Sequence, residues 1–420
     1  MRQRTRLYTH GVIPMLLCFA GGLAGCFGAS GAGPAGPRAE AAASVDQRLI
    51  AADTRFGLDL FHKVRAEEPD KNIFLSPASA SLALLMTYNG ARGDTQQAMA
   101  RALSVEAMTA AEVNQANGAL QSILANPDKR VRIDIANSIW YKQGFTINRQ
   151  FQSAVQEHYR AEVKPVNFGE AGAEKTINQW VAKATQDRIK SIIDRTKPLD
   201  RMVLINAIYF NGTWQKPFNE KSTRPAPFTR EDGSVKEHPM MFQSGRYRYL
   251  KGDNFQAAVL PYGEGRINLY VFVPDQGVTL NRFYEGLTPE NWESWMGRFA
   301  PKEGAVAIPK LKLEYDKELN DALKALGMAI AFDGDHADFG NLFAGSDEHL
   351  YISLVKQKTY LDMNEHGTEA AAVTAVTVTA TSAPPVDDRF KLVADRPYFI
   401  AIRDDQTGAV LFVGSIVDPE

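Results

Sequence analysis

Apolar residues in the first half of the chain recur with the period of an α-helix. Phe151, Val155 and Tyr159 lie four residues apart. A second apolar stripe follows soon after, at Ile177, Trp180, Val181 and Ala184. Spacing of this kind places the side chains on one face of a helix, so it predicts two amphipathic helices. We expect the apolar face of each helix to pack in the core, because aromatic residues in such a stripe are usually buried.

The residues around position 76 carry the signals of a helix start. Ser76 can cap free backbone N–H groups with its side chain, and Pro77 suits the first helical position. An apolar run follows, and Gly90 is expected to close this helix. Asp94 and Thr95 predict the start of another helix. Helices are therefore concentrated in the N-terminal part of the chain.

Later segments have nearly continuous apolar runs instead. Met202–Phe210 and Ile267–Val273 fit strands that are buried on both faces. At the C-terminus, Tyr398–Ile402 and Ala409–Ile416 flank a polar loop, which predicts a β-hairpin. Helices first and extensive sheet later indicate the α+β class.

The composition is that of a soluble globular protein. The 420 residues are 45% hydrophobic and 23% charged, and 47 basic side chains oppose 49 acidic ones. A net charge of −2, without a stripe of Lys and Arg, excludes a general attraction to nucleic acid. Only two cysteines occur, Cys18 and Cys26, so a framework of internal disulfides is also excluded.

The N-terminal residues predict export. Three arginines precede an apolar stretch at 11–25, which is shorter than the roughly 20 residues that span a bilayer. We interpret residues 1–25 as a signal peptide. The stretch ends in Leu23-Ala24-Gly25-Cys26, which resembles the bacterial lipobox. Cys26 would then become the new N-terminus and carry a lipid; the alternative is an ordinary signal peptide with an incidental cysteine.

Residues 26–44 consist mostly of Gly, Ala, Ser and Pro. This composition cannot bury enough apolar surface to fold, so we predict a flexible tether. No second linker follows, and residues 45–420 are expected to form a single domain. The predicted product is an exported lipoprotein that is anchored to a membrane at the bacterial cell surface or in the periplasm, or is extracellular if released.

Local signatures of enzyme active sites are missing. After residue 26 the sequence has no G-x-S-x-G, H-E-x-x-H, Walker or strand-linked G-x-G-x-x-G motif. Residues 333–338 (Asp-Gly-Asp-His-Ala-Asp) are the best metal candidate, but they lack the spacing of a calcium loop and predict a solvated acidic turn. We therefore assign no catalytic residue, no metal site and no cofactor.

One segment does not fit a core. Residues 370–383 contain only Ala, Val, Thr and one Ser, without a charge, Gly or Pro. The run has high strand propensity and is bounded by Gly367 before it and by Pro384-Pro385 after it. Taken alone, it is typical of a linker or a buried strand. If it were exposed, it would need a partner strand, because neutral β-prone segments aggregate.

A series of motifs gives this segment its context. Each motif is weak alone, but together they follow one another in a specific order. In chain order they are Phe74–Ser79, Asn89–Thr95, Asn206–Trp214, Leu260–Tyr262, Leu323–Met328, Asn364–Ala371 and Phe412–Gly414. On these residues the chain from about Val45 to Glu420 resembles a serpin. The resemblance implies the serpin fold, in which helices weighted toward the N-terminus pack on large mixed β-sheets and a reactive loop is exposed.

The resemblance also implies a function. A target serine protease cleaves the reactive loop of a serpin as a substrate, and the freed segment inserts as a new strand into the main sheet. Rapid insertion traps the protease as a covalent acyl-enzyme, whereas slow insertion lets water hydrolyse the ester. We therefore expect an irreversible inhibitor that acts as a monomer and is not an enzyme. The hinge that insertion requires corresponds to Glu365, Gly367, Thr368, Glu369, Ala370, Ala371 and Ala372.

Counting the usual sixteen residues from Glu365 places the cut at Thr381-Ser382. Ala380 and Val378 are alternatives, because loop lengths vary. A small β-branched residue cannot reach an acidic pocket of the trypsin type or fill a deep aromatic one, but it suits a shallow apolar pocket. The expected targets are elastase-like or subtilisin-like proteases.

The resemblance further assigns residues that keep the main sheet closed, both at its centre and at the end where the loop inserts: Ser76, Ser79, Asn206, Trp214 and Gln357. Many serpins have a histidine in place of Gln357, whose amide can form hydrogen bonds but cannot titrate. His366 stands where a second glutamate is common, and we expect it to be an exposed loop residue without a function. The alternative functions are a non-inhibitory serpin that binds or carries a ligand, and a hydrolytic enzyme.

Overall fold

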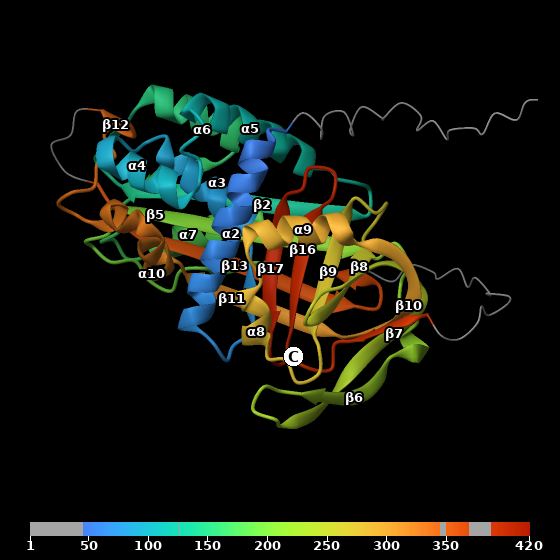
Figure 1. Ribbon diagram of the computed structural model, residues 1–420. Helices are drawn as coiled ribbons and strands as arrows, with labels where there is room; N and C mark the ends of the chain where they lie inside the picture. The colour runs from blue at the N-terminus through green and yellow to red at the C-terminus, as the bar shows by residue number, and fades with distance from the viewer. Residues whose placement is uncertain (1–44, 126, 345–349, 369–387) are drawn as a thin grey trace, which may run out of the picture. The chain divides into compact units, whose positions relative to one another are not determined.

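The computed structural model describes residues 45–125, 127–344, 350–368 and 388–420 (Figure 1). The α-helices are α2 (Gln47–Glu67), α3 (Pro77–Tyr88), α4 (Gly93–Ala102), α5 (Ala110–Leu124), α6 (Arg149–Tyr159), α7 (Ala173–Ala184), α8 (Leu280–Glu285), α9 (Pro289–Arg298) and α10 (Asn320–Leu323). Short helical turns of other types are η1 (Glu220–Ser222), η2 (Lys324–Met328) and η3 (Ala329–Phe332). Within these described ranges, no helix is long and apolar enough to cross a membrane.

The strands form two large sheets and one short pair. The nine-stranded sheet has the order β1 (Ile73–Leu75), β17 (Val410–Ile416), β16 (Tyr398–Asp404), β9 (Ile267–Pro274), β8 (Phe255–Pro261), β7 (Val235–Lys251), β10 (Ala300–Pro309) and β15 (Phe390–Val393), with β6 (Arg224–Thr229) paired to β7. The six-stranded sheet has the order β11 (Leu311–Glu318), β13 (Ile352–Asn364), β14 (Gly367–Thr368), β5 (Met202–Thr213), β2 (Val131–Lys142) and β4 (Glu162–Val166). The short pair is β12 (Phe343–Ala344) with β3 (Thr146–Ile147).

Both sheets are mixed, and helices from the first part of the chain pack on them, so the predicted α+β class is confirmed. The long apolar runs became the buried strands β5 and β9, and the C-terminal hairpin formed from β16 and β17. The two amphipathic helices also formed, as α6 and α7. The helical stripes are buried at Phe151, Val155, Tyr159, Ile177 and Val181.

Helix α3 begins and ends where the sequence predicts, although Gly90 does not adopt the conformation of a glycine cap. The side chain of Ser76 accepts a hydrogen bond from the backbone N–H of Ser79, and Pro77 occupies the first turn. The helix ends at Tyr88, and Gly90 lacks the positive φ that closes a helix. Gly90 instead allows close packing, because a Cβ there would lie 2.8 Å from side-chain atoms of Leu342. The helix therefore ends next to Gly90 as expected, but this glycine does not adopt the left-handed conformation of a glycine cap.

Two helices determine what surrounds the centre of the six-stranded sheet. Helix α3 contacts β5 of this sheet and β17 of the larger sheet, so it lies between the two (Figure 1). Helix α7 covers the opposite face of β5, where Ile177 and Val181 pack with Val203, Ile205 and Ala207. Both faces of β5 are thus covered, which explains its continuous apolar sequence.

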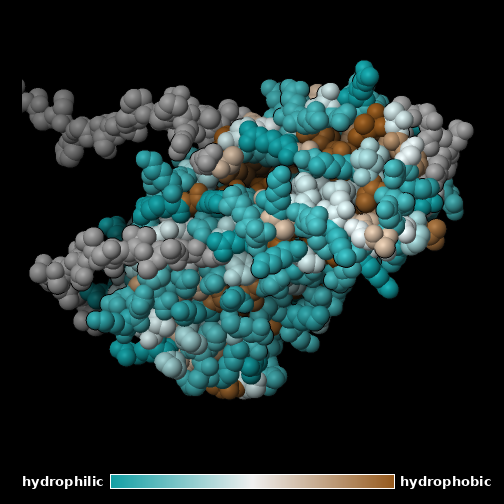
Figure 2. Space-filling model, turned by 180° about the vertical axis from the view of Figure 1, so that it is seen from behind, coloured by the Kyte–Doolittle hydropathy of each residue, from teal (hydrophilic) through white to brown (hydrophobic). Residues whose placement is uncertain are grey.

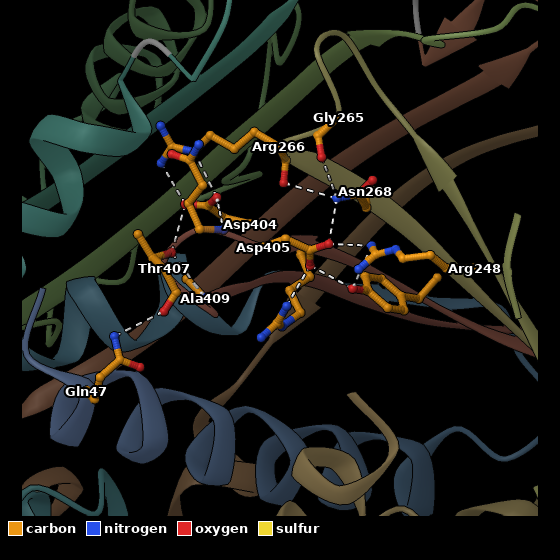
Figure 3. A network of polar contacts seen from close by, with 12 residues as sticks. Gln47, Arg248, Gly265, Arg266, Asn268, Asp404, Asp405, Thr407 and Ala409 are labelled. Atoms are coloured by element: carbon orange, nitrogen blue, oxygen red, sulfur yellow. Dashed lines mark hydrogen bonds and ion pairs between the residues drawn. The ribbon is translucent and has the colours of Figure 1, made fainter. Parts of the chain in front are cut away.

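The turn between β16 and β17 is fixed by a polar network (Figure 3). Arg266 donates hydrogen bonds of 2.8 and 2.7 Å to the carboxylate of Asp404, and both residues are buried. The hydroxyl of Thr407 donates to the same carboxylate. The neighbouring Asp405 accepts hydrogen bonds from Asn268 and Arg248. These charges are compensated within the fold.

The surface seen from behind is mainly hydrophilic, with hydrophobic residues gathered in small separate areas (Figure 2). Among the described residues, the large hydrophobic side chains that are most exposed are Leu199, Val235 and Phe242.

Candidate functional site

The two central strands of the six-stranded sheet pair along most of their length and part at one end. β13 and β5 are parallel, from Ile352 opposite Met202 to Tyr360 opposite Tyr209. Beyond these pairs, β14 lies between the two strands and is antiparallel to both. The sheet is therefore closed at its centre, while its parted end already holds the beginning of an additional strand.

Gly367 occupies the narrow place where this additional strand begins. Its φ of 148° is one that L side chains rarely adopt. A Cβ atom at this position would lie 2.7 Å from the Cα of Thr213 and would also collide with the carbonyl oxygen of Gly212. Glycine is the residue that fits between the two backbones, so the geometry explains the residue at this hinge position.

Thr368 points into the core at the parted end of the sheet. Its side chain is buried, and its hydroxyl lies 2.8 Å from the hydroxyl of Tyr262. The ring of Tyr262 stacks on Trp214, with 4.2 Å between the ring centroids. Burial raises the pKa of Tyr262, which keeps its hydroxyl protonated as a hydrogen-bond partner. A small polar side chain fits this position, because it is buried and contacts the hydroxyl of Tyr262, whose ring stacks on Trp214.

The turn that joins β13 to β14 is held by the segment that follows β5. The indole Nε1 of Trp214 donates to the carbonyl of Asn364 at 2.8 Å. The backbone N–H of Trp214 donates to the carbonyl of His366, and that of Phe218 donates to the carbonyl of Glu365. Three consecutive carbonyls of the turn are therefore satisfied by one neighbouring segment, which fixes the orientation of the hinge.

Glu365 ties the same turn to the larger sheet. Its carboxylate lies 3.0 Å from the ammonium of Lys310 and accepts a 2.8 Å hydrogen bond from the hydroxyl of Thr223. Burial alone would raise the pKa of this carboxyl, but the hydrogen bonds from Thr223 and Lys310 outweigh burial and hold the pKa below its ordinary value. Glu365 is therefore a charged anchor of the hinge at neutral pH.

His366 differs from the exposed residue that the sequence predicts. Its side chain is 22% exposed, and its Nε2 lies 2.9 Å from a carboxylate oxygen of Glu220 in η1. The backbone N–H of His366 donates to the side chain of Asn364. The expectation failed because Glu220 is distant in sequence.

Buried amides connect the closed centre of the sheet to α3. Gln357 and Asn206 are paired across β13 and β5, and the amide of Gln357 donates to the side-chain oxygen of Asn206 at 2.5 Å. Gln357 also donates to the carbonyl of Ser76 and accepts from its N–H, each at 3.0 Å. Asn206 donates to the carbonyl of Ser79 at 2.9 Å and to the side chain of Asn137. Separating β13 from β5 would break the contact between the two amides.

The structure thus brings the predicted Ser76, Ser79, Asn206 and Gln357 together at the centre, and Trp214, Glu365, Gly367 and Thr368 together at the parted end. The remaining predicted positions lie outside the described residues: Cys26, Glu369, Ala370, Ala371, Ala372, Thr381 and Ser382. Sequence reasoning did not assign a role to Tyr262, Asn137, Lys310 or Glu220. Of these, Tyr262 carried a signal, because it belongs to the motif Leu260–Tyr262.

Comparison with known proteins identifies this arrangement. Residues 51–419 match the family described as "Serpin (serine protease inhibitor)". The chain belongs to the serpin family. A serpin-like protein of Thermococcus kodakarensis is 32% identical over 378 residues, which cover 89% of this chain and 87% of the relative. Leukocyte elastase inhibitor of Bos taurus is 32% identical over 385 residues, covering 89% of this chain and 100% of that protein.

Solved structures agree with this assignment. The thermophilic serpin tengpin in its native state superimposes with a TM-score of 0.83 at 30% identity, over 89% of this chain and 95% of that chain. The predicted serpin fold is therefore confirmed. Serpins typically inhibit serine proteases and are not enzymes. In the part of this serpin that the structure describes, no group of three or more His, Cys, Asp or Glu residues could hold a metal ion.

Proposed function

We propose that this serpin is an irreversible suicide-substrate inhibitor of serine proteases with elastase-like or subtilisin-like specificity. The observation that carries the proposal is the position of β14. Gly367 and Thr368 already pair with both β13 and β5, and the two strands pair directly with each other beyond them. The sheet can accept one more strand, and the residues that would form it follow β14 in the sequence.

The register of β14 defines where each later residue would pair after insertion. Thr368 lies opposite Met363 of β13 and Gly212 of β5, and both pairings are antiparallel. Six residues further along the loop, Thr374 would therefore lie opposite Gln357 on one side and Asn206 on the other. Its side chain would point to the same face as Thr368, since residues at even spacing share a face of a strand. The hydroxyl of Thr374 can then form a hydrogen bond with the side-chain amides of Gln357 and Asn206, which no longer contact each other.

The loop sequence suits a strand in this position. On the face shared with Thr368, the following residues would be Ala370, Ala372, Thr374 and Val376, all of them small or β-branched. If roughly a dozen residues each gain a ladder hydrogen bond worth about 1 kcal/mol, insertion releases on the order of 10 kcal/mol. A whole domain has a stability of similar size, so insertion can perform mechanical work on an attached protease.

The chemistry of trapping is that of an interrupted peptide hydrolysis. The serine hydroxyl of the protease attacks the carbonyl carbon of Thr381, and the peptide bond to Ser382 breaks. The proton from the serine passes to the leaving amine, which becomes the new N-terminus at Ser382. The Thr381 carbonyl stays on the protease as an ester. Insertion displaces the protease before water can hydrolyse this ester, so the covalent complex persists.

The N-terminal signals support a location for this activity. We propose that residues 1–25 are removed, that Cys26 carries the lipid, and that residues 26–44 tether the serpin domain to the membrane of a bacterium. A tethered inhibitor would meet proteases at the cell surface or in the periplasm.

The experiment that tests the proposal uses the chain from Val45 onward and a panel of elastase-like, subtilisin-like and trypsin-like proteases. We expect a denaturant-stable adduct on a gel with at least one elastase-like or subtilisin-like enzyme, together with a released peptide that begins at Ser382. Cleavage of the loop across the whole panel, without an adduct and with active protease remaining, would contradict inhibition. That result would favour a serpin that binds or carries a ligand.

The specificity is tested by Thr381→Arg. An arginine at the cut would reach the acidic pocket of trypsin-like proteases, so the variant should lose elastase-type reactivity by at least tenfold and gain reactivity toward trypsin. The second-order rate constants of inhibition measure this exchange. Thr379→Arg is the matched control, because it carries the same change two residues before the proposed cut. Unchanged reactivity of Thr381→Arg toward the elastase-like enzyme would show that the bond lies elsewhere.

A further inference from the structure

A sheet face with several exposed residues adjoins the strand that follows the reactive loop in the sequence. Three strands contribute to it, namely β7, β10 and β15, and their pairings place rows of residues side by side. We call it the open face. Its residues are Phe242, Ser244 and Arg246 of β7, Glu303, Ala305 and Ala307 of β10, Lys391 and Val393 of β15, and Arg389 just before β15.

The pairings show that these side chains share one face. Ser244 and Lys391 both lie opposite Ala305, in neighbouring strands on its two sides. The intervening residues point the other way, and Val306, Ile308 and Leu392 are buried in the core. The open face is therefore the solvent side of this part of the sheet, and β7 and β10 can be followed toward it at the lower right of Figure 1.

The open face carries three exposed cations and one exposed carboxylate, that of Glu303, which lies opposite Arg246 in the neighbouring strand. Arg246, Arg389 and Lys391 are exposed, and they have no ion pair or side-chain hydrogen bond with any described residue. Arg248, two residues along the same strand, behaves differently, because its guanidinium pairs with Asp405 (Figure 3). The same guanidinium also contacts the hydroxyl of Tyr270. The fold neutralises one arginine of β7 and leaves the other available.

An apolar contact lies beside these charges. Phe242 is 43% exposed, whereas most aromatic side chains of the described residues are buried. Its cross-strand neighbour is Ala307, and the next row holds Ser244 and Ala305. Because these neighbouring side chains are small, they do not project beyond the ring of Phe242. A partner protein can therefore contact the ring and the cations at the same time. An exposed aromatic residue next to unpaired cations is typical of a protein-binding surface.

The position of the open face relative to the predicted cleavage site indicates which partner would bind it. Phe390, the first residue of β15, follows Ser382 by eight residues, a length that spans at most about 30 Å, and β15 is the strand that supplies Lys391. A protease docked on the loop is therefore held beside the open face. We infer that the open face is a secondary binding site for the target protease, and that it selects a protease with acidic and apolar residues beside its active-site cleft. This inference rests on the proposed inhibitory function and adds a second determinant of its specificity.

Exposed charges of this kind change the rate at which the inhibitor and the protease associate. Exposed cations that face an acidic surface raise the association rate at low salt, and they contribute little once salt screens them. The open face should therefore change how fast the protease engages the loop, and it should leave unchanged the fraction of encounters that end in trapping. Trapping depends on the sheet, which lies elsewhere.

The test compares the wild-type chain with the double variant Arg246→Glu, Lys391→Glu. Lys63→Glu, Arg101→Glu is the matched control, because it makes the same change of net charge on exposed residues of α2 and α4. The second-order rate constant of inhibition and the number of inhibitor molecules consumed per protease are measured at low and high salt, with an elastase-like and a subtilisin-like protease of acidic surface. Phe242→Ala is measured separately, since it removes the ring without any change of charge.

We expect the double variant to associate at least tenfold more slowly at low salt, with the difference narrowing at high salt and the stoichiometry unchanged. The control should keep the wild-type rate, and Phe242→Ala should slow association severalfold at both salt concentrations. Equal rates for the double variant and the wild type would overturn the inference while leaving the inhibitory function intact, because adducts would still form. Absence of any adduct with the wild type would overturn the inhibitory function, and the inference would fall with it.

Discussion

The two ends of the β13–β5 seam are in different states within one structure. At the hinge end, Gly367 and Thr368 lie between the strands. Hydrogen bonds from the backbone N–H groups of Trp214 and Phe218 hold the preceding turn in place. At the centre, Gln357 and Asn206 lie directly opposite each other and are joined by a hydrogen bond. Under the proposed mechanism, loop insertion would start at the parted end of the seam and would then have to separate the paired strands at its centre.

The difference separates two roles. Residues at the hinge end decide whether the first loop residues can enter the sheet, since they fit a space that already exists. Residues at the centre decide how easily the strands separate, because their hydrogen bonds must be broken before the loop can advance. Hinge variants should therefore change the outcome of the reaction with a protease. Centre variants should change the stability of the intact protein.

The largest expected effect is at the hinge end. Thr368→Arg would place a long charged side chain where Thr368 is buried over Tyr262, and burying an unpaired charge is costly. Insertion should stall, so the protein should become a substrate. We expect the number of inhibitor molecules consumed per protease to rise at least tenfold, as measured by titration of residual protease activity. The control Thr368→Ser keeps the hydroxyl and should remain an inhibitor; if Thr368→Arg also inhibits with unchanged stoichiometry, the hinge does not control the outcome.

Substitutions at the centre of the β13–β5 seam should change the free energy of unfolding of the intact protein. Gln357→Ala removes the partner of Asn206 and of both backbone groups of Ser76, and these polar groups are buried. An unsatisfied buried group costs about 1–3 kcal/mol, so the intact protein should lose about 3 kcal/mol or more. Urea unfolding of the uncleaved chain measures this loss. Gln143→Ala removes an exposed amide and should cost less than about 0.5 kcal/mol. Similar midpoints for the two variants would remove the distinction between centre and surface.

The smallest effect concerns the outer anchor of the hinge and depends on pH. The pKa of Glu365 is lowered in the folded protein, so its contribution is present above the ordinary glutamate pKa and is lost as the pH falls through the folded value. Glu365→Gln should therefore destabilise the intact chain by about 1 kcal/mol at pH 7, and by progressively less as the pH is lowered through the folded pKa of Glu365. Thermal unfolding over this pH range measures the difference. An equal loss at every pH would mean that the ion pair with Lys310 contributes nothing.

Local signals in the sequence predicted the regular elements well. Ser76 with Pro77 marked the start of α3, and continuous apolar runs marked β5 and β9, because capping and burial act within a few residues. Gly90 follows the end of α3 as expected, but it lacks the left-handed conformation and packs closely against Leu342, which is far away in the chain.

The site was only partly predictable for the same reason. Ordered motifs located the hinge and the central amides. The hydroxyl contact of Thr368 with Tyr262 and the side-chain contact of His366 with Glu220 join residues that are more than one hundred positions apart. No periodicity or local motif contains such pairings, because the register of distant strands creates them.

The most direct test of the account is the stability of the chain after its loop has been cut. The intact and the loop-cleaved proteins should be compared by thermal unfolding, with cleavage by a protease that is not trapped. If the loop inserts between β13 and β5, the cleaved protein gains on the order of 10 kcal/mol, and its midpoint should rise by on the order of 10 °C. If the two proteins unfold at the same temperature, the loop does not enter the sheet and the proposed mechanism is wrong.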